Sequence, residues 1–132
     1  MIVADTSVWV DYLDRNATPQ AAILDALLDE PEFAMGDLVI MEVLRGIRHE
    51  ERLARVARDF ASYEVLAMAP TPVVLKSAEH CRFLRSRGIS IGGTIDCLIA
   101  TFCITGRHQL LHADRDFDAF EQYLDLQVFR GF

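Results

Sequence analysis

Short apolar runs and longer amphipathic segments alternate along the 132 residues of the chain. Each apolar run is bounded by polar or turn-forming residues, which is typical of a buried strand. The expected strands are residues 1–4, 32–35, 63–68, 109–113 and 126–129. The expected helices are residues 6–15, 18–30, 38–47, a charged segment ending near residue 60, and residues 73–88, 94–106 and 115–124. This alternation predicts one α/β domain with helices on both faces of a mostly parallel sheet.

Several helix ends carry recognisable local signals. Thr18 is the expected N-cap of a helix that begins at Pro19, because proline suits the first helical position. Asp37 is placed to cap the helix over residues 38–47. Two prolines should break the chain before the helix that starts at residue 73, and Gly88 should end that helix.

Four acidic residues stand in surroundings that offer no local cation. Asp96 lies near the start of the segment IGGTIDCLIATFCITG, residues 91–106, which contains no Lys or Arg. Asp5 and Asp114 each follow an expected strand, and Glu42 lies inside the apolar segment LVIMEVL. Because the carboxyl ends of parallel strands share one edge of a sheet, we expect these acids to converge there.

Each acid also has a purely local interpretation. Asp5 could cap the helix that follows it, and Asp96 could stabilise its own helix through the helix dipole. Glu42 could point outward between apolar neighbours. The acids of the segment ADRDFDAF could form an acidic first turn and a solvated face: Asp114, Asp116 and Asp118. These separate interpretations must treat two acids at strand ends and two in apolar helices as unrelated.

A bound divalent cation would explain the acids together. Carboxylates a few ångströms apart repel one another, whereas Mg²⁺ or Mn²⁺ turns them into ligands. Zinc fits less well, because structural zinc favours Cys and His at close spacing. His108 and His112 have i,i+4 spacing but span an expected strand, which would separate them by roughly 13 Å. We interpret both as ordinary surface or strand-end residues.

The cysteines and the N-terminus favour the cytoplasm. Cys81, Cys97 and Cys103 form no CxxC pair, and the last two lie in an apolar segment where thiols pack as small hydrophobic groups. They suggest a reducing compartment. The N-terminus MIVADTSVW lacks the basic flank of a signal peptide, and no apolar run is long enough for a membrane helix. We therefore expect a cytoplasmic protein with no membrane association.

Charge is distributed unevenly along the chain, whose net charge is −7. Residues 45–87 contain nine basic and five acidic residues, while the remainder contains four basic and fifteen acidic residues. A basic rim that faces a polyanion such as RNA would produce this asymmetry. A solvated helix face would also account for the run of arginines.

Four segments together resemble a known family. They are VADTSVWVDYL at the N-terminus, MEVLRG at 41–46, TIDCLIA at 94–100 and HADRDFDAF at 112–120. In this order and at these intervals they resemble the four acidic motifs of PIN-domain ribonucleases. The small size and the DTS-W opening are similar to the VapC toxins of type II toxin–antitoxin pairs. The resemblance covers the whole chain and implies a three-layer α/β/α fold with a mostly parallel central sheet of four to five strands.

The resemblance also implies roles for individual residues. Asp5, Glu42, Asp96 and Asp114 correspond to the catalytic acids, with Asp116 as a further possible metal ligand. We expect Asp5 and Asp96 to bind Mg²⁺ directly, with Mn²⁺ able to substitute, and Asp114 with or without Asp116 to complete the first or a second metal site. Glu42 would orient or deprotonate the attacking water. Contacts with the substrate are assigned to Ser7, Arg82, Arg85 and Arg87. Ala113 departs from the family, in which Asn, Thr or Ser commonly precedes the last acid.

The implied activity is endonucleolytic cleavage of single-stranded or loop RNA, such as a tRNA or rRNA loop. The implied partners are a VapB-type antitoxin, whose tail would pack on residues 6–30 and 37–58, and a second copy of the chain in a homodimer. Two alternatives remain. One is a degenerate PIN domain that only binds protein or RNA. The other is a metal-dependent phosphatase of another α/β class, although Asp5 is followed by TSV and not by a second Asp two residues on.

Overall fold

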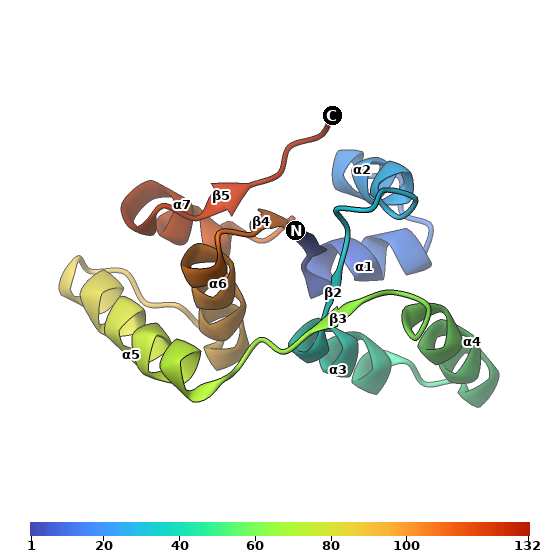
Figure 1. The fold of residues 1–132 in the computed structure, drawn as a ribbon, viewed down its shortest axis with the longest axis horizontal. Coiled ribbons are helices and arrows are strands. Elements are labelled where there is room, and N and C mark those ends of the chain that lie inside the picture. The colour runs from blue at the N-terminus through green and yellow to red at the C-terminus, as the bar shows by residue number, and fades with distance from the viewer.

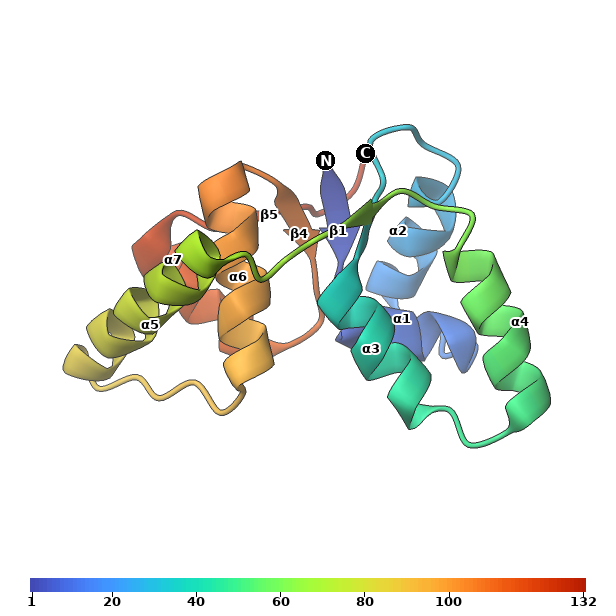
Figure 2. The ribbon, with the colours of Figure 1, turned by 60° about the horizontal axis from the view of Figure 1, so that its bottom comes forward.

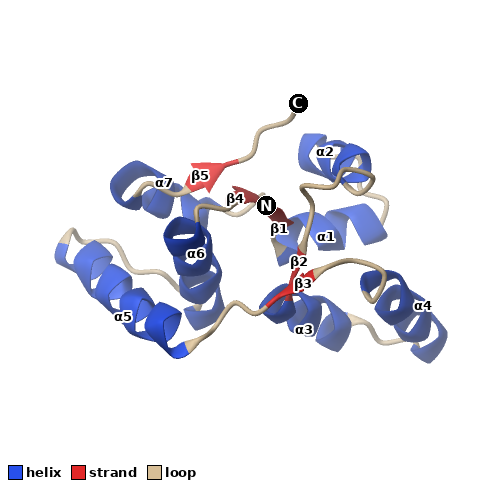
Figure 3. Cartoon of the chain, viewed as in Figure 1, coloured by secondary structure: helices blue, strands red, loops and turns tan.

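Strands and helices alternate along residues 1–132 in the computed structural model (Figures 1 and 3). The strands are β1 (Ile2–Ala4), β2 (Met35–Gly36), β3 (Val65–Leu66), β4 (Gln109–Leu111) and β5 (Gln127–Val128). The α-helices are α1 (Thr6–Leu13), α2 (Pro19–Leu27), α3 (Asp37–Gly46), α4 (Glu50–Phe60), α5 (Thr71–Ser86), α6 (Thr94–Gly106) and α7 (Asp118–Leu124). A short 3₁₀ helix, η1 (Arg115–Phe117), precedes α7. None of the helices is long and apolar enough to cross a membrane.

All strand pairs are parallel. Strands β1, β4 and β5 form one sheet in that order with β4 in the middle, and β2 and β3 form a second, two-stranded sheet. An isolated parallel bridge between Ile2 and Phe33 links the two sheets. Across this link Ile2 donates its N–H to the carbonyl of Glu32 at 2.7 Å, and Ala34 donates to the carbonyl of Ile2 at 3.1 Å. The predicted α/β class with a mostly parallel central sheet is therefore confirmed.

The strands lie between two groups of helices. Helices α1 to α4 lie on one side of β1 and helices α5 to α7 on the other (Figures 1 and 2). Val3 in β1 and Leu110 in β4, which are paired in register, are both fully buried. On the α1 side, Trp9 packs edge-on against Phe60 of α4, with ring centroids 4.8 Å apart. Burial on both sides explains why β1 is apolar throughout and why β4 is apolar after its exposed first residue, Gln109.

The observed helix ends agree with the local sequence signals at α2 and differ from them at α3 and α5. Thr18 caps α2, because its Oγ1 accepts the N–H of Ala21 at 3.0 Å. Asp37 is the first residue of α3 and not its cap, and its Oδ1 accepts N–H groups from Leu38 and Met68. Helix α5 starts two residues earlier than predicted, because Pro72 is tolerated in a first turn.

Helices α5 and α6 are joined by polar and sulfur contacts. Cys81 of α5 and Cys97 of α6 form a disulfide, with Cα atoms 6.8 Å apart. Next to it His80 Nδ1 lies 3.0 Å from Thr101 Oγ1, and both side chains are buried. Of the two cysteines expected to pack as thiols, only Cys103 is free and buried, and the disulfide at Cys97 does not support the reducing compartment that the cysteines suggested. Sequence spacing did not indicate the pair because its members lie 16 residues apart on different helices.

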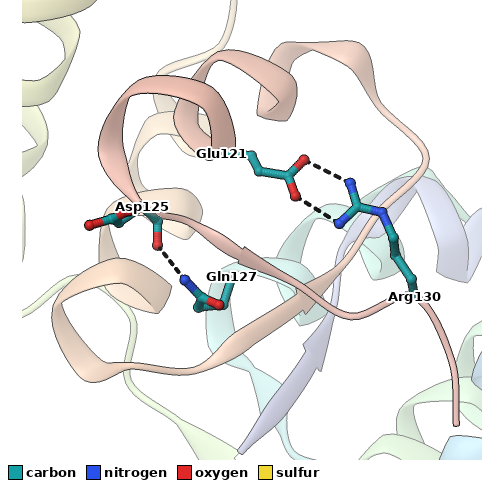
Figure 4. Close-up of polar contacts among 4 residues, drawn as sticks. All are labelled: Glu121, Asp125, Gln127 and Arg130. Atoms are coloured by element: carbon teal, nitrogen blue, oxygen red, sulfur yellow. Dashed lines mark hydrogen bonds and ion pairs between the residues drawn. The ribbon is translucent and has the colours of Figure 1, made fainter.

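The C-terminal segment is held to its own half of the fold by polar contacts (Figure 4). Arg130 donates two hydrogen bonds to the carboxylate of Glu121, at 2.7 and 2.8 Å. Gln127 of β5 donates its side-chain amide to the carbonyl of Asp125 at 3.3 Å. Beyond Arg130 the chain end passes towards α2 (Figure 1), where a Cβ on Gly131 would lie 3.6 Å from Ile23.

Candidate metal centre

The carboxyl ends of β1 and β4 deliver two of the predicted acids to one edge of the sheet. Asp5 directly follows β1 and is the N-cap of α1, while Asp114 follows β4 and is the N-cap of η1. Asp96 lies in the first turn of α6, Glu42 lies in the middle of α3, and Asp116 lies in η1. Five acids from widely separated segments therefore approach one another.

These acids form two groups that share one member. We call Asp5, Glu42 and Asp96 the inner triad, and Asp96, Asp114 and Asp116 the outer triad. Within each triad one carboxylate oxygen per residue lies within 4.8 Å of the others. The structure thus brings together all five acids that the sequence predicted, with Asp96 between the two groups. Asp118, which the family motif does not use, belongs to neither triad.

Asp5 is the most deeply buried of these acids. Only 2% of it is exposed. Its Oδ2 accepts hydrogen bonds from Ser7, from the backbone N–H at 3.1 Å and from Oγ at 2.7 Å. Its Oδ1 is buried and has no hydrogen-bond partner. Burial raises the pKa of Asp5, and the hydrogen bonds from Ser7 oppose this effect only in part. Asp5 therefore does cap α1, but capping uses only one of its two oxygens.

Glu42 is oriented by a residue that the sequence reasoning missed. Thr6 Oγ1 donates a hydrogen bond to Glu42 Oε1 at 2.7 Å, which joins the first turn of α1 to the middle of α3. The alternative in which Glu42 points into solvent is therefore wrong. Nothing in the sequence pairs these two residues, because they are 36 positions apart. The only available signal was that Thr6 lies beside Asp5 within the DTS motif.

Asp96 is the acid of the cluster whose pKa is raised both by burial and by all four of the other acids. Burial raises its pKa to about 7, and the nearby charges of Asp5, Asp114 and Glu42 add to this effect. The loop before α6 comes close to it, since a Cβ on Gly93 would lie 3.1 Å from Asp96 Oδ2. Without a cation, the Asp96 carboxyl is therefore only partly ionised at neutral pH.

The outer triad is held by a turn after β4. Asp114 Oδ1 accepts the backbone N–H of Asp116 at 2.9 Å. The backbone N–H of Asp114 lies 3.2 Å from Nδ1 of His112, and that of Ala113 lies 3.1 Å from Ser7 Oγ. Ser7 therefore connects Asp5 to the turn that carries Asp114. His112 was interpreted as an ordinary strand-end residue, and its contact with Asp114 was missed.

The donor set fits a hard divalent cation. All five groups are carboxylates, and no lysine or arginine forms an ion pair with any of them. The unpartnered Asp5 Oδ1 and the raised pKa of Asp96 are the marks of carboxylates that need a positive charge. Oxygen-only sites of this kind suit Mg²⁺ or Mn²⁺ and do not suit zinc.

Basic residues line two separate pockets, and only one of these pockets includes an acid of the cluster. Arg82 and Arg85 of α5 line a shallow hollow that contains none of the acids. Arg87 lies over the rings of Phe83 and Tyr123, at 5.1 and 5.9 Å from their centroids. The structure therefore does not join the three predicted substrate arginines to the acidic cluster.

A different pair of arginines shares a pocket with Glu42. This pocket, of about 330 Å³, lies between α1, α3 and the start of α4 and is lined by Arg48 and Arg52. Arg52 also pairs with Asp14 at 2.8 Å. The sequence contained these arginines within its basic region but gave no reason to prefer them to Arg82 and Arg85.

The fold and the acidic centre define a class of protein. A family model of the PIN domain matches residues 2–122, and the chain belongs to this family. The predicted resemblance is thereby confirmed.

Within the family, the chain is similar to individual VapC proteins. The chain is 29% identical over 130 residues to Ribonuclease VapC11 of Mycobacterium tuberculosis, with 97% of each chain covered. VapC ribonuclease Mb1587 of Mycobacterium bovis is similar to the same extent. Among solved structures, the fold resembles VapBC2 from Rickettsia felis bound to a DNA fragment from its promoter. That match has a TM-score of 0.75 at 20% identity and covers 98% of each chain.

Proposed function

We propose that the 132 residues form one nuclease domain, a Mg²⁺-dependent endoribonuclease that acts as the toxin of a toxin–antitoxin pair. The observation that carries this proposal is the cluster of five carboxylates with no cationic partner and with an unpartnered buried oxygen on Asp5. Membership of the PIN domain family and the likeness to VapC ribonucleases along almost the whole chain support it. Mn²⁺ should replace Mg²⁺, because both prefer oxygen ligands.

The expected reaction is hydrolysis of an RNA phosphodiester. Water attacks the phosphorus and the bond to the 3′ oxygen breaks, which leaves a 5′-phosphate and a 3′-hydroxyl. A bound divalent cation supplies Lewis-acid stabilisation of the phosphoryl oxygens and of the leaving oxygen. Asp5 and Asp96 would hold it, and Asp114 with Asp116 would complete this site or a second one. Glu42, held at Oε1 by Thr6, can use its other oxygen to accept the proton of the attacking water.

The RNA backbone should reach the acids past basic side chains. Arg48 and Arg52 are suited to this role because they line the pocket that also contains Glu42. Arg82 and Arg85 remain candidates for contacts with more distant phosphates. Ser7 is better placed to hold Asp5 than to bind RNA, since its Oγ already bonds to Asp5 and Ala113. Single-stranded or loop RNA is the expected substrate, as the resemblance to PIN-domain ribonucleases implies. We therefore also expect the protein to act in the cytoplasm, where its proposed RNA target would be found.

A VapB-type antitoxin is the expected partner. Val10, Leu13, Val43 and Ile47 give the pocket beside Glu42 an apolar floor, within the helices that the sequence assigned to this partner. An antitoxin tail packed there could direct an arginine or lysine to the inner triad, because a guanidinium satisfies carboxylates through paired hydrogen bonds. The tail would then exclude both the cation and the RNA.

A homodimer is the second expected assembly. Helix α5 exposes Leu75 (63%) and Val74 (43%) to solvent, and Met41 of α3 is 44% exposed. These exposed apolar side chains are available for a contact with a second copy of the chain. Light scattering of the purified chain at two concentrations will measure its mass, and a monomer at both would contradict this part of the proposal.

The test of the proposed activity is cleavage of RNA with and without a cation. Purified protein should cut RNA with Mg²⁺ or Mn²⁺ and stop in EDTA, and excess Mg²⁺ should restore cutting. Asp96→Asn should lose activity by at least about 100-fold, because Asp96 belongs to both triads. Asp118→Asn is the matched control and should cut like the wild type. Cleavage that persists in EDTA would exclude the metal mechanism, and an inactive wild-type protein with a bound cation would favour the degenerate binding module.

A further inference from the structure

His112 lies one residue beyond β4, where the chain leaves the sheet for the outer triad. Its Nδ1 lies 3.2 Å from the backbone nitrogen of Asp114. We propose that His112 is a positioning residue, which accepts this N–H and so aims the Asp114 carboxylate at the cation site. The proposal rests on the metal-dependent function proposed above and adds a residue to it.

Asp114 needs such a hold because it lies on a turn. Its own Oδ1 accepts the N–H of Asp116 at 2.9 Å, which leaves Oδ2 without a hydrogen bond and available to a cation. The direction of the side chain then depends on how the Asp114 backbone is fixed. His112 is the side chain that bonds to the Asp114 backbone N–H. Without this acceptor, the turn between the sheet and η1 could rotate and carry Oδ2 away from Asp96.

The His112 ring is itself held in place. It packs against Phe117, with ring centroids 5.0 Å apart and planes inclined by 47°. Phe117 is fully buried, so the orientation of the imidazole is tied to the hydrophobic core. The bond also defines the tautomer, because a nitrogen that accepts a hydrogen bond carries no proton. The proton of the neutral ring must therefore be on Nε2.

The side chain of the residue between His112 and Asp114 cannot support the turn by a hydrogen bond. Position 113, between His112 and Asp114, is an alanine. The methyl group of alanine cannot form a hydrogen bond. Ser7 Oγ takes up the backbone N–H of Ala113, and His112 takes up that of Asp114. Two side chains from other positions thus supply the polar support that position 113 lacks.

The bond can be observed directly in the metal-free wild-type protein. With uniform ¹⁵N labelling at pH 8, His112 Nδ1 should show the chemical shift of an unprotonated ring nitrogen. A coupling across the hydrogen bond should join it to the amide nitrogen of Asp114. A protonated Nδ1, or the absence of this coupling, would overturn the proposal. This measurement needs neither a cation nor RNA.

Three substitutions separate the acceptor from the bulk of the ring. His112→Asn keeps an acceptor at nearly the same reach from the backbone as Nδ1. His112→Gln moves the acceptor one methylene further out, and His112→Phe keeps the packing on Phe117 but has no acceptor. Removing a group that orients a metal ligand commonly weakens metal binding by about 10-fold or more. We therefore expect the Kd for Mn²⁺ to rise by about 10-fold in His112→Gln and His112→Phe and to stay within about threefold in His112→Asn.

Calorimetric titration with Mn²⁺ measures these constants, RNA cleavage provides a second readout, and melting temperatures show whether each variant is folded. The positioning role is supported if Mn²⁺ affinity falls where the acceptor at the Nδ1 position is missing and if this fall does not follow the melting temperature. His112→Phe binding Mn²⁺ like the wild type, or His112→Asn as weak as His112→Gln, would overturn it. If the wild type binds Mn²⁺ but cuts no RNA, the ribonuclease proposal fails, while the Mn²⁺ constants and the NMR coupling still decide the role of His112.

Discussion

The inner and outer triads share Asp96 but are supported in different ways. The inner triad combines the N-cap of α1 with one residue each from α3 and α6, and Thr6 and Ser7 of α1 fix Glu42 and Asp5 through side-chain hydrogen bonds. The outer triad depends on the turn between β4 and α7, where Asp114 is held mainly through backbone groups. Asp5 is also nearly fully buried, whereas Asp114 and Asp116 are only partly buried.

This difference indicates which of the two triads should bind a divalent cation more tightly. Burial of Asp5 with one unpartnered oxygen is unfavourable, and a cation removes that cost. Asp114 and Asp116 are partly exposed and stay partly hydrated, so binding a cation there should release less free energy than binding it at Asp5. We therefore expect the inner triad to bind a divalent cation more tightly, and the outer triad to complete its coordination or to hold a second, weaker ion. Asp96 would contribute to both positions.

The strongest way to break this comparison is to remove one acid from each triad. Asp5→Asn should lower RNA cleavage by at least about 100-fold, because it removes the buried oxygen that has no other partner. Asp116→Asn should lower it by about 10-fold, since Asp116 belongs only to the outer triad. Single-turnover cleavage rates at saturating Mg²⁺ provide the measurement. Equal losses in the two variants would mean that the triads do not differ in importance.

A pH titration of stability tests the unpaired charge of the inner triad. The pKa of Asp96 is raised to about 7 in the folded chain from its ordinary value of 3.8. The stability linked to this group is therefore complete below pH 3.8 and is lost as the pH rises through about 7. Metal-free wild-type protein should lose about 2 kcal/mol relative to Asp96→Asn between pH 5 and pH 8, a value reduced for solvent screening.

The comparison with Asp96→Asn is needed because other groups also titrate in this range. Burial lowers the pKa of His80, His108 and His112, and a lowered histidine pKa makes stability rise with pH. Both proteins share that contribution, so the difference between them reports on Asp96. Urea unfolding at each pH gives the free energies. Saturating Mg²⁺ should restore the stability that the wild type loses at pH 8. If wild type and Asp96→Asn show parallel profiles of unfolding free energy against pH without Mg²⁺, the inner triad does not carry an unpaired charge.

The support of Glu42 by Thr6 provides a sharper test of the inner triad. Thr6→Val removes the hydroxyl that donates to Glu42 Oε1 but keeps the shape of the side chain. We expect kcat to fall by about 10-fold, as is usual when a group that orients an active residue is lost. Thr6→Ser retains the hydroxyl and should recover most of the rate. A Thr6→Ser protein as slow as Thr6→Val would show that the methyl group, and not the hydrogen bond, is what matters.

A smaller effect is expected from the loop that faces Asp96. A Cβ on Gly93 would lie 3.1 Å from Asp96 Oδ2, so Gly93→Ala should push this carboxylate by a few tenths of an ångström. We expect a rise of about threefold in the Kd for Mg²⁺, from misplacing a ligand that both triads use. Gly46→Ala is the control, because a Cβ there has no neighbour within 4 Å. Equal Mg²⁺ affinities in the two variants would show that Asp96 has room to adjust.

The sequence predicted the features that depend on local signals or on strand ends. Helix α6 was placed correctly because an apolar run follows two glycines and ends in another. Asp5 and Asp114 were placed at one edge because parallel strands end there. Strand β2 was expected at residues 32–35 but is Met35–Gly36, since Phe33 pairs only through an isolated bridge to β1. An apolar run shows that a segment is buried but does not fix its register.

Other parts of the site depend on contacts that have no sequence signal. Thr6 and Glu42 meet because α1 packs against α3, and this packing is a property of the whole fold. The role of His112 depends on the direction of one ring nitrogen in a turn. Charge composition indicates only a basic region, and tertiary structure is needed to separate Arg48 and Arg52, beside Glu42, from Arg82 and Arg85.

The central claim is that the inner triad is a hard-cation site, and anomalous scattering from Mn²⁺ in crystals of the protein tests it most directly. The account predicts a Mn²⁺ peak bonded to carboxylate oxygens of Asp5 and Asp96, at about 2.0–2.2 Å as expected for a small octahedral divalent ion. The same peak should be absent from crystals of Asp96→Asn grown under the same conditions. A wild-type crystal soaked in Mn²⁺ at active concentrations, with no peak at the inner triad or with one only at a remote surface, would contradict the account.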